Sequence, residues 1–558
     1  MAPAPSSQRI RASSIAETLQ NHLDPSTLPF LRAFALGYLA ETLPALVKAV
    51  SKRKGKSAFQ IVLQLVKALK FKPRGGLAVA FAIAVGGGKY GERLLEPVVR
   101  RVYLKARDHV KARANSGKGK EKEVVLTEEE ELEELKKEHK IVQTITTACS
   151  ATISSFFAIL VLQSSPSYRR PSTPLAVSTD PKLDFSVSPY TFTTTAKQVR
   201  PSGREGRRKE ERKVQSPTLD ITLFVFIRAV DTLVRGLYHH TGATDGRFGP
   251  VTTFIASNAD TLTFALSCFV IMRSWFYFPE ALPPSYNRWI LNLARMDKRL
   301  LELLRYARNG RFVYGKRPDQ QVLEMCHGIA QGAGKDISAT NPEFISRFSC
   351  AFVHGQVGKG SCEMNATKRW ARAFLDCLLI YLPVHAIPPL LFNFSKVLSQ
   401  PGSSILRILL AASRSSAFLA TFVASIYASV CLVRTRIPSL FPRGFIPQQP
   451  LDGGLAVYLG CIMCGLSLLI ENKRRRREMA LFTATRALYA VVDDVLPSFI
   501  TQGQTGEFLT KWLERIVFST SAGTVIAATV HRPDLVSGVV KGVVGVAVKD
   551  WHGKKKTT

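Results

Sequence analysis

Cysteine and histidine residues gather between positions 326 and 362, and thiolate and imidazole groups are the usual protein ligands of zinc. Cys326, Cys350, His354 and Cys362 could supply three thiolates and one imidazole. Their spacing differs from the paired C-x2-C pattern of zinc fingers, so a local disulfide or buried reduced thiols are the alternatives. We expect no cofactor and no metal here, and keep these four residues as the candidate ligands if a metal does bind.

A second pattern with catalytic potential is His240 followed by Asp245. The same His-x4-Asp spacing lets lipid acyltransferases orient a catalytic histidine with a carboxylate. No glycine-rich acyl-acceptor motif follows it, so we interpret the stretch as a polar turn at a membrane edge. We therefore predict no catalytic residue and no enzyme, with a membrane lipid acyltransferase as the second alternative function.

Charged residues inside apolar stretches are the stronger functional candidates, because an unpaired charge in a bilayer costs at least about 2.5 kcal/mol. Arg228 with Asp231, and Arg486 with Asp493, occupy such positions. Each Arg and Asp could form a structural clamp, or could line a polar groove for a lipid headgroup or a polypeptide. Both interpretations remain open at this point.

Small residues spaced for close helix packing occur twice. Gly87 with Gly91, and Gly460 with Gly465, offer faces on which two helices could approach closely. Helix packing is the expectation, and lining of a translocation path is the alternative.

The elements that carry these residues are apolar. The chain has 558 residues, 46% of them hydrophobic, and a net charge of +34. Its Lys and Arg residues cluster in short runs between apolar stretches, for example Lys473 to Arg477, which suits anionic lipid headgroups. The basic runs lack interleaved aromatic residues, so we predict a lipid bilayer with anionic headgroups as the partner and no nucleic acid.

Apolar runs close to the roughly 20 residues needed to span a bilayer recur along the chain. They predict an all-α fold, a polytopic membrane helical bundle, rather than a large soluble helical protein. We expect eight of them to span, and predict interfacial helices at 57–69 and 289–306. The runs are 28–50, 75–88, 142–162, 219–237, 252–278, 373–392, 411–433, 453–470, 479–496 and 517–530.

Three pairs of segments match in the same order and indicate an internal duplication. One pair aligns Arg228-Ala229 with Arg486-Ala487, and another places Phe264 on Phe518 without gaps. Four spans per half would return the chain to its starting side, so we predict two parallel four-span repeats. In this arrangement Glu471 and Lys473 to Arg477 would form a tight turn at the headgroups, between two spanning helices.

These patterns divide the chain into seven segments. Composition predicts that the basic loop is disordered. The segments are a flexible N-terminus (1–26), spans 1–3 of the first half with a linker and charged helix at 115–140 (27–163), the disordered basic loop (164–217), the end of the first half with an interfacial helix (218–310), the Cys/His-containing connection (311–369), the second half (370–550) and a basic tail (551–558).

Two motifs carry a resemblance to a known family. The stretch "CAFVHGQVGKGSC" with the following "RAFLDCLLIYLPVHAIPPLLF", and the stretch "LLIENKRRRR", resemble the transmembrane protein 135 family, also called the peroxisomal membrane protein 52 family. The four-helix halves are also similar to the Tim17, Tim22 and Tim23 translocase group. The matching residues are Cys350, His354, Cys362, Tyr381, Pro383, Glu471, Lys473, Arg475 and Arg476.

The resemblance implies an integral membrane protein of peroxisomes or mitochondria, involved in organelle dynamics and lipid or sterol handling, with no known enzymatic reaction. A lipid or sterol ligand and a homo-oligomer are compatible with it. A translocase-like channel or carrier for protein or solute is the first alternative. Lys555 and Lys556 near the C-terminus fit a retrieval signal, so the endoplasmic reticulum is the alternative location.

Overall fold

Regular structure is helical throughout the part of the chain that the computed structural model describes, and no strand occurs there. This confirms the predicted all-α fold class. The described residues are 27–51, 76–115, 128–165, 216, 218–241, 249–354, 357, 361–392, 394–442, 445–495, 503–549 and 551.

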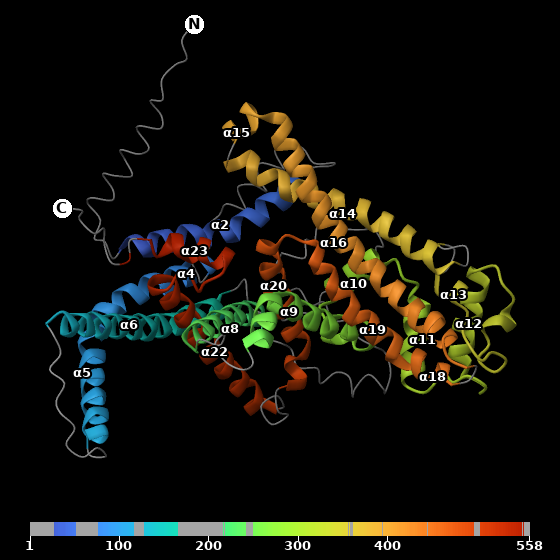
Figure 1. Cartoon of the computed structure of the whole chain (residues 1–558), viewed down its shortest axis with the longest axis horizontal. Helices are drawn as coiled ribbons and strands as arrows, with labels where there is room; N and C mark the ends of the chain where they lie inside the picture. The colour runs from blue at the N-terminus through green and yellow to red at the C-terminus, as the bar shows by residue number, and fades with distance from the viewer. Residues whose placement is uncertain are drawn as a thin grey trace, which may run out of the picture. The chain divides into compact units, whose positions relative to one another are not determined.

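The chain forms two compact units. Unit 1 comprises Met1–Ala243 and Leu496–Thr558. Its helices, labelled in Figure 1, are α2 (Thr27–Ser51), α4 (Leu77–Ala82), η1 (Ile83–Gly87), α5 (Gly88–Asn115), α6 (Glu128–Ser164), α8 (Leu219–Thr241), α22 (Gly503–His531) and α23 (Gly538–Ala547).

Unit 2 comprises Thr244–Val495. It begins with α9 (Gly249–Tyr277), η2 (Pro279–Ala281), α10 (Pro284–Ala294), α11 (Lys298–Arg308), α12 (Gln320–Gly332), η3 (Ile337–Thr340) and α13 (Cys350–His354). It continues with α14 (Cys362–Phe392), α15 (Phe394–Ser399), α16 (Pro401–Cys431), η5 (Leu432–Arg436), α17 (Ile437–Ser439), α18 (Gln448–Pro450), η6 (Leu451–Leu455), α19 (Ala456–Met463), η7 (Cys464–Ile470) and α20 (Lys473–Val495).

Five helical stretches of the described chain are long and apolar enough to cross a membrane. They are Leu132–Ser164, Gly249–Tyr277, Cys362–Leu390, Pro401–Ser439 and Gln448–Ile470. Each overlaps one of the predicted apolar runs, and their composition is compatible with an integral membrane protein.

The helices of unit 1 pack in a definite order. α2 packs on α4 and η1, α6 packs on η1 and α5, α22 packs on α6, and α8 packs on α22. Small residues permit a close approach of α6 to η1. At this contact Ser154 Oγ donates a hydrogen bond to the Ala84 carbonyl at 2.8 Å. α22 runs antiparallel to α6, because Arg515 Nε contacts Gln163 at one end and His531 Nε2 lies 3.0 Å from Thr147 Oγ1 at the other.

Unit 2 repeats this order with its own helices. α14 packs on α16, α16 packs on α19 and η7, α9 packs on α19 and η7, and α20 packs on α9. α9 belongs to unit 2 although it follows α8 in the chain, and α22 belongs to unit 1 although it follows α20. The compact units therefore differ from the predicted sequence halves, because α9 to α11 lie in unit 2 and α22 and α23 lie in unit 1.

Charged residues mark both ends of the antiparallel pair formed by α16 and the helix from α18 to η7. Arg434 contacts Asp452 at one end, and Ser415 contacts Glu471 at the other. No charged residue lies between Ser415 and Arg434, or between Asp452 and Glu471. Each stretch is about 19 residues, or about 28 Å of helix.

The structure differs from the predicted helix at 289–306, which is two helices instead of one. Arg295 adopts a left-handed conformation with φ 46° and ends α10. Asp297 then caps α11, because its side chain accepts a hydrogen bond from the Arg299 backbone N–H at 2.9 Å. An Asp two residues past an apolar stretch is a recognisable helix start, so the break was readable from the sequence.

Three other predicted segments lie wholly or almost wholly outside the described part of the chain. The predicted helix at 57–69, residues 166–215 of the basic loop, and the N-terminal segment lie outside the described residues. The charged part of 115–140 is helical from Glu128 and continues directly into the apolar part of α6.

Candidate metal centre and buried polar clusters

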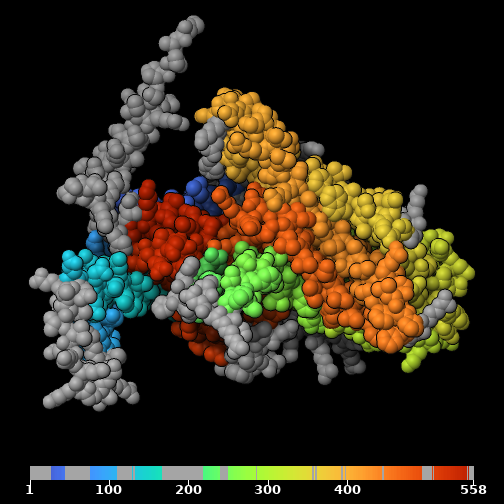
Figure 2. All heavy atoms as spheres, viewed as in Figure 1, coloured from blue at the N-terminus to red at the C-terminus, as the bar shows by residue number. Residues whose placement is uncertain are grey.

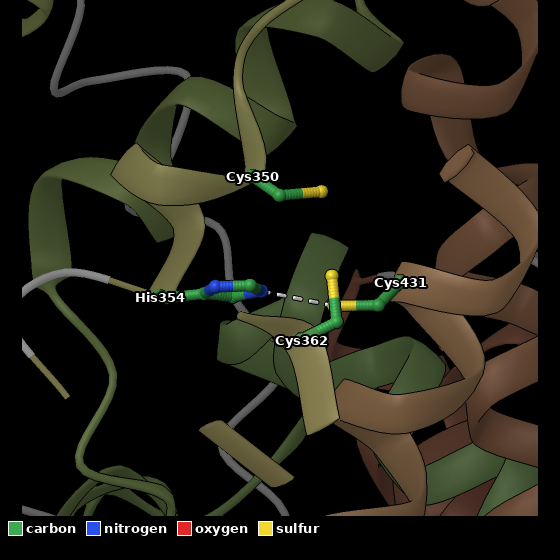
Figure 3. Close-up of side chains that lie close together, drawn as sticks. All are labelled: Cys350, His354, Cys362 and Cys431. Carbon is green, nitrogen blue, oxygen red and sulfur yellow. Dashed lines mark hydrogen bonds between the residues drawn. The ribbon is translucent and has the colours of Figure 1, made fainter. Parts of the chain in front are cut away.

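Three cysteines and one histidine of unit 2 converge where three helices end or begin. Cys350 and His354 are the first and last residues of α13, so their four-residue spacing puts them on one helix face. Cys362 begins α14, and Cys431 ends α16. The potential ligand atoms of these four residues all lie within 4.8 Å of one another (Figure 3).

Burial in this thiol cluster (Cys350, His354, Cys362 and Cys431) increases toward the helix bundle. His354 is fully buried, Cys431 is buried, and Cys350 and Cys362 are partly exposed. His354 Nε2 lies 3.2 Å from Cys431 Sγ, as the dashed line in Figure 3 shows. All four side chains therefore direct their ligand atoms toward one another, and two of the four are partly exposed.

A buried ion pair holds the backbone beside this cluster. Arg434 Nε and Nη2 donate to the Asp452 carboxylate at 2.5 and 3.0 Å, and Nη2 also donates to the Phe348 carbonyl at 2.9 Å. Tyr314 donates its hydroxyl to Asp452 at 2.5 Å and accepts from the Phe348 backbone N–H at 3.1 Å. Both backbone groups of Phe348, two residues before Cys350, are thus fixed.

The local charges favour a thiolate and a neutral imidazole. A hydrogen bond with the Cys431 thiol, followed by the positive charge of Arg434, lowers the pKa of Cys350 to about 6. Burial, with the charges of Arg369 and Arg434, lowers the pKa of His354. Deprotonated sulfur with neutral imidazole is the form that binds metal ions; the same thiols could form a disulfide.

Sequence reasoning identified three members of this cluster and missed the fourth. Cys326, the predicted fourth candidate, is buried in α12 and packs in a separate core with Phe312, Phe348 and Phe352. Cys431 lies within the predicted apolar run 411–433, away from the other cysteines in the sequence. The sequence signal that could have identified Cys431 is topological. Consecutive spanning helices are antiparallel, so the end of α16 lies beside the start of α14.

The other motif residues form a second polar cluster at the opposite end of α16. Glu471 is 1% exposed, and its carboxylate accepts from Ser415 Oγ at 2.7 Å and from the Asn472 backbone N–H at 2.9 Å. His385 Nε2 lies 3.1 Å from Ser415 Oγ and 2.9 Å from Arg475 Nη1. Glu471 is therefore a buried acceptor, and not the headgroup-facing residue that we expected.

The basic run begins a helix and is not a loop. Lys473 is the first residue of α20 and is exposed. Arg476 donates to the Glu471 and Leu469 carbonyls at 2.9 and 2.5 Å, which satisfies carbonyls at the end of η7. Tyr381 is buried and stacks on the His385 ring, and Pro383 lies inside α14.

Three of the four charged residues predicted inside apolar runs have partners in their own neighbourhood. Arg228 is buried, donates to Ser537 Oγ at 2.8 Å and lies over the Phe224 ring. Asp231 pairs with Arg235 at 3.0 Å. Arg486 lies over the Phe482 ring at 5.7 Å. The side chain of Asp493, in α20, lies outside the description.

The predicted packing glycines all lie at close helix contacts. A methyl group added at Gly87 would lie 3.0 Å from the Cβ of Ser154 in α6. One added at Gly91 would lie 3.2 Å from the Cβ of Ser150. One at Gly460 would lie 3.3 Å from the Ile426 carbonyl oxygen, and one at Gly465 would overlap the Ala265 backbone. Gly523 of α22, which overlies Thr152 of α6, was missed.

A polar cluster in unit 1 was also missed. Glu92 is buried, and its carboxylate accepts from Thr147 Oγ1 at 2.8 Å and from Trp551 Nε1 at 2.9 Å. Lys89 pairs with it at 2.7 Å. Glu92 lies between Lys89 and Arg93 in a charged stretch, and no local pattern distinguishes it from a solvent-exposed glutamate.

The remaining sequence candidates cannot be placed. The side chain of His240, Asp245, and the C-terminal Lys555 and Lys556 lie outside the described residues. Comparisons of this chain with protein-family models, with curated proteins and with solved structures gave no match.

Proposed function

We propose that this chain is an integral membrane protein of peroxisomes or mitochondria that acts in organelle dynamics and lipid homeostasis without catalysing a reaction. The observation that carries the membrane part is the pair formed by α16 and the helix from α18 to η7. Both have about 28 Å of uncharged helix, close to the roughly 30 Å of a bilayer core. Their charged ends meet at Arg434 with Asp452 and near Glu471.

Exposed apolar side chains support contact with lipid. Only 17% of the apolar window of α14 is buried within the structure, and Leu375 and Leu379 on it are 61% and 77% exposed. Phe441 and Phe445 are exposed and stacked beyond the Arg434 end of α16, where an aromatic belt would lie. Atoms of α9, in green, and of α16, in orange, reach the surface of the face drawn in Figure 2.

The identical packing order of the two units supports two parallel repeats. In unit 1 each helix packs on the next in the order α2, α4 to α5, α6, α22 and α8. In unit 2 the corresponding order is α14, α16, α19 with η7, α9 and α20. The fourth member of each order, α22 or α9, comes from the other sequence half. The ungapped overlay of Phe264 on Phe518 places α9 and α22 in equivalent positions. Exchange of equivalent helices within one chain is the counterpart of domain swapping between identical protomers.

The location and the role rest on the resemblance to the transmembrane protein 135 family. The test is a copy tagged within 164–217, leaving both ends native, and imaged with peroxisomal, mitochondrial and reticular markers. We expect peroxisomal or mitochondrial signal, and changed organelle shape and lipid content in a deletion strain that the tagged copy restores. A purely reticular signal, or unchanged lipids and organelles on deletion, would reject the proposal.

A carrier or channel is the second candidate, favoured by the Glu471, Ser415, His385 and Arg475 cluster. Buried ionisable groups within apolar helices mark ion and substrate pathways in transporters. For this candidate, the reconstituted chain transports a polar solute, Glu471→Gln reduces transport at least tenfold, and Glu302→Gln, on the exposed surface of α11, leaves it unchanged. Equal transport by both variants would exclude a role of this cluster.

A further inference from the structure

We propose that Cys350, His354, Cys362 and Cys431 bind one zinc ion in a tetrahedral site that fastens α13 to the adjoining ends of α14 and α16. Tetrahedral zinc bound at about 2.3 Å from sulfur separates its ligand sulfurs by about 3.8 Å. The four ligand atoms already lie within 4.8 Å of one another. An inward shift of the partly exposed Cys350 and Cys362 side chains completes the geometry.

The charge around the cluster fits the charge of the complex. Zinc with three thiolates and a neutral imidazole carries one net negative charge. Arg369 is 9% exposed, and its contacts in the described chain are neutral: the Asn365 side-chain oxygen, the carbonyls of Ala294 and Arg295, and the Tyr427 ring. A buried guanidinium with neutral contacts is costly, so a nearby anionic complex stabilises it.

The surrounding structure holds the ligands in place before a metal binds. The N–H and the carbonyl of Phe348 are bound by Tyr314 and Arg434, and Arg434 follows Cys431 by three residues in η5. One buried network therefore fixes the segments that carry Cys350 and Cys431. Arg434 and Tyr314 are positioning residues, because they act on the ligands through the backbone.

Zinc explains the whole donor set better than a disulfide. A disulfide joins two sulfurs and leaves the third thiol and the imidazole without a role. Among the described residues, the Nδ1 atom of His354 has no hydrogen-bond partner. Nε2 faces Cys431, so the ring has one nitrogen directed at the sulfurs. A closed set of three thiolates and one imidazole is typical of structural zinc sites.

The test is the metal content of the full chain, purified in detergent without chelators and measured by mass spectrometry of the elements. We expect about one zinc per chain. Cys350→Ser, Cys362→Ser and His354→Ala should each reduce this to below about a tenth, whereas His354→Cys should retain it because four thiolates also bind zinc. The matched control is Cys326→Ser, which removes a buried cysteine outside the cluster and should keep the zinc.

A second measurement uses the unaltered chain, so its result does not depend on whether the variants fold. Cobalt, exchanged into the unaltered chain, should give the visible absorption of a tetrahedral thiolate complex, which added zinc abolishes. Peptide mapping without reductant should show Cys350 and Cys362 unlinked. A Cys350–Cys362 disulfide, iron in place of zinc, or a chain that takes up neither metal would each overturn the proposal.

Discussion

Arg434 is the residue on which most contacts near the thiol cluster depend. Its side chain is 4% exposed and joins the Asp452 carboxylate to the backbone two residues before Cys350. Two charges buried together are weak evidence for net stability, but removing one of them leaves the other uncompensated. The pair therefore gives a sharp test of the structure at this end of α16.

Arg434→Gln should lower the stability of the chain by about 3–5 kcal/mol, because Asp452 is left charged and buried. The measurement is the unfolding temperature of the purified chain in detergent. The matched variant replaces both partners, Arg434→Met with Asp452→Leu, and should recover much of the loss. If the double variant is no more stable than the single one, the two groups are not a buried pair.

Asp297 gives a test at the start of α11. Asp297→Ala should cost about 1 kcal/mol, because the cap of the Arg299 backbone N–H is lost. Asp297→Asn retains a capping group and loses only the charge. Unfolding temperatures of the three chains at pH 7 rank them, and an alanine variant as stable as the parent would refute the cap.

The same residue predicts a pH dependence. Hydrogen bonding to the Arg299 side chain lowers the pKa of Asp297 below 3.8. A lowered carboxyl pKa stabilises the folded chain fully above that ordinary value, and this stabilisation is lost as the pH falls through the lowered pKa. The advantage of the parent over Asp297→Asn should therefore be constant from pH 7 to about 5 and shrink below pH 4.

At the scale of elements, the contact between α9 and η7 depends on Gly465. A side chain at this position would overlap the backbone of Ala265, so the two helices approach as closely as glycine allows. The antiparallel contact continues to the far end, where Tyr277 and Tyr458 rings lie edge to face at 5.8 Å. This close approach explains why α9 packs in unit 2.

Gly465→Ala should destabilise the chain by about 1–3 kcal/mol, since α9 and η7 must separate to admit the methyl group. Gly402→Ala, in the first turn of α16 with nothing within 4 Å of the added carbon, is the control and should be neutral or slightly stabilising. Thermal unfolding of both variants in detergent compares them. Equal stability of the two would mean that the helices are not in close contact.

At the scale of the whole molecule, the polar ends of α16 and η7 predict a sidedness in the membrane. Pro401 begins α16 on the Ser415 side of the uncharged stretch, and Ser439 lies beyond the Arg434 end. Gly402 and Ser439 are both exposed in the structure. The two positions should face opposite compartments, because about 28 Å of uncharged helix separates the two polar ends.

Gly402→Cys and Ser439→Cys should react differently with a membrane-impermeant maleimide in sealed organelles. Exactly one of the two added thiols should be labelled before permeabilisation and both afterwards, with the parent chain as the background for native cysteines. Labelling of both thiols in sealed organelles would contradict a spanning α16.

The sequence by itself determined the helical class, the apolar stretches and the positions of four close-packing glycines, Gly87, Gly91, Gly460 and Gly465. These properties depend on hydrogen bonds and spacings within a few residues, which the local sequence contains. It also identified Cys350, His354 and Cys362, because they lie close together in the chain.

Only the tertiary structure decided which distant segments meet. The antiparallel contact of α16 with α14 brings Cys431 into the thiol cluster. The antiparallel contact of α16 with η7 lets Ser415 donate a hydrogen bond to the buried Glu471. The placement of α9 in unit 2 and of α22 in unit 1 likewise depends on contacts between segments far apart in the sequence. Apolar helices of similar composition can pack in several orders, so the choice rests on side-chain fit across the contacts, as between Gly465 and Ala265, which no local pattern encodes.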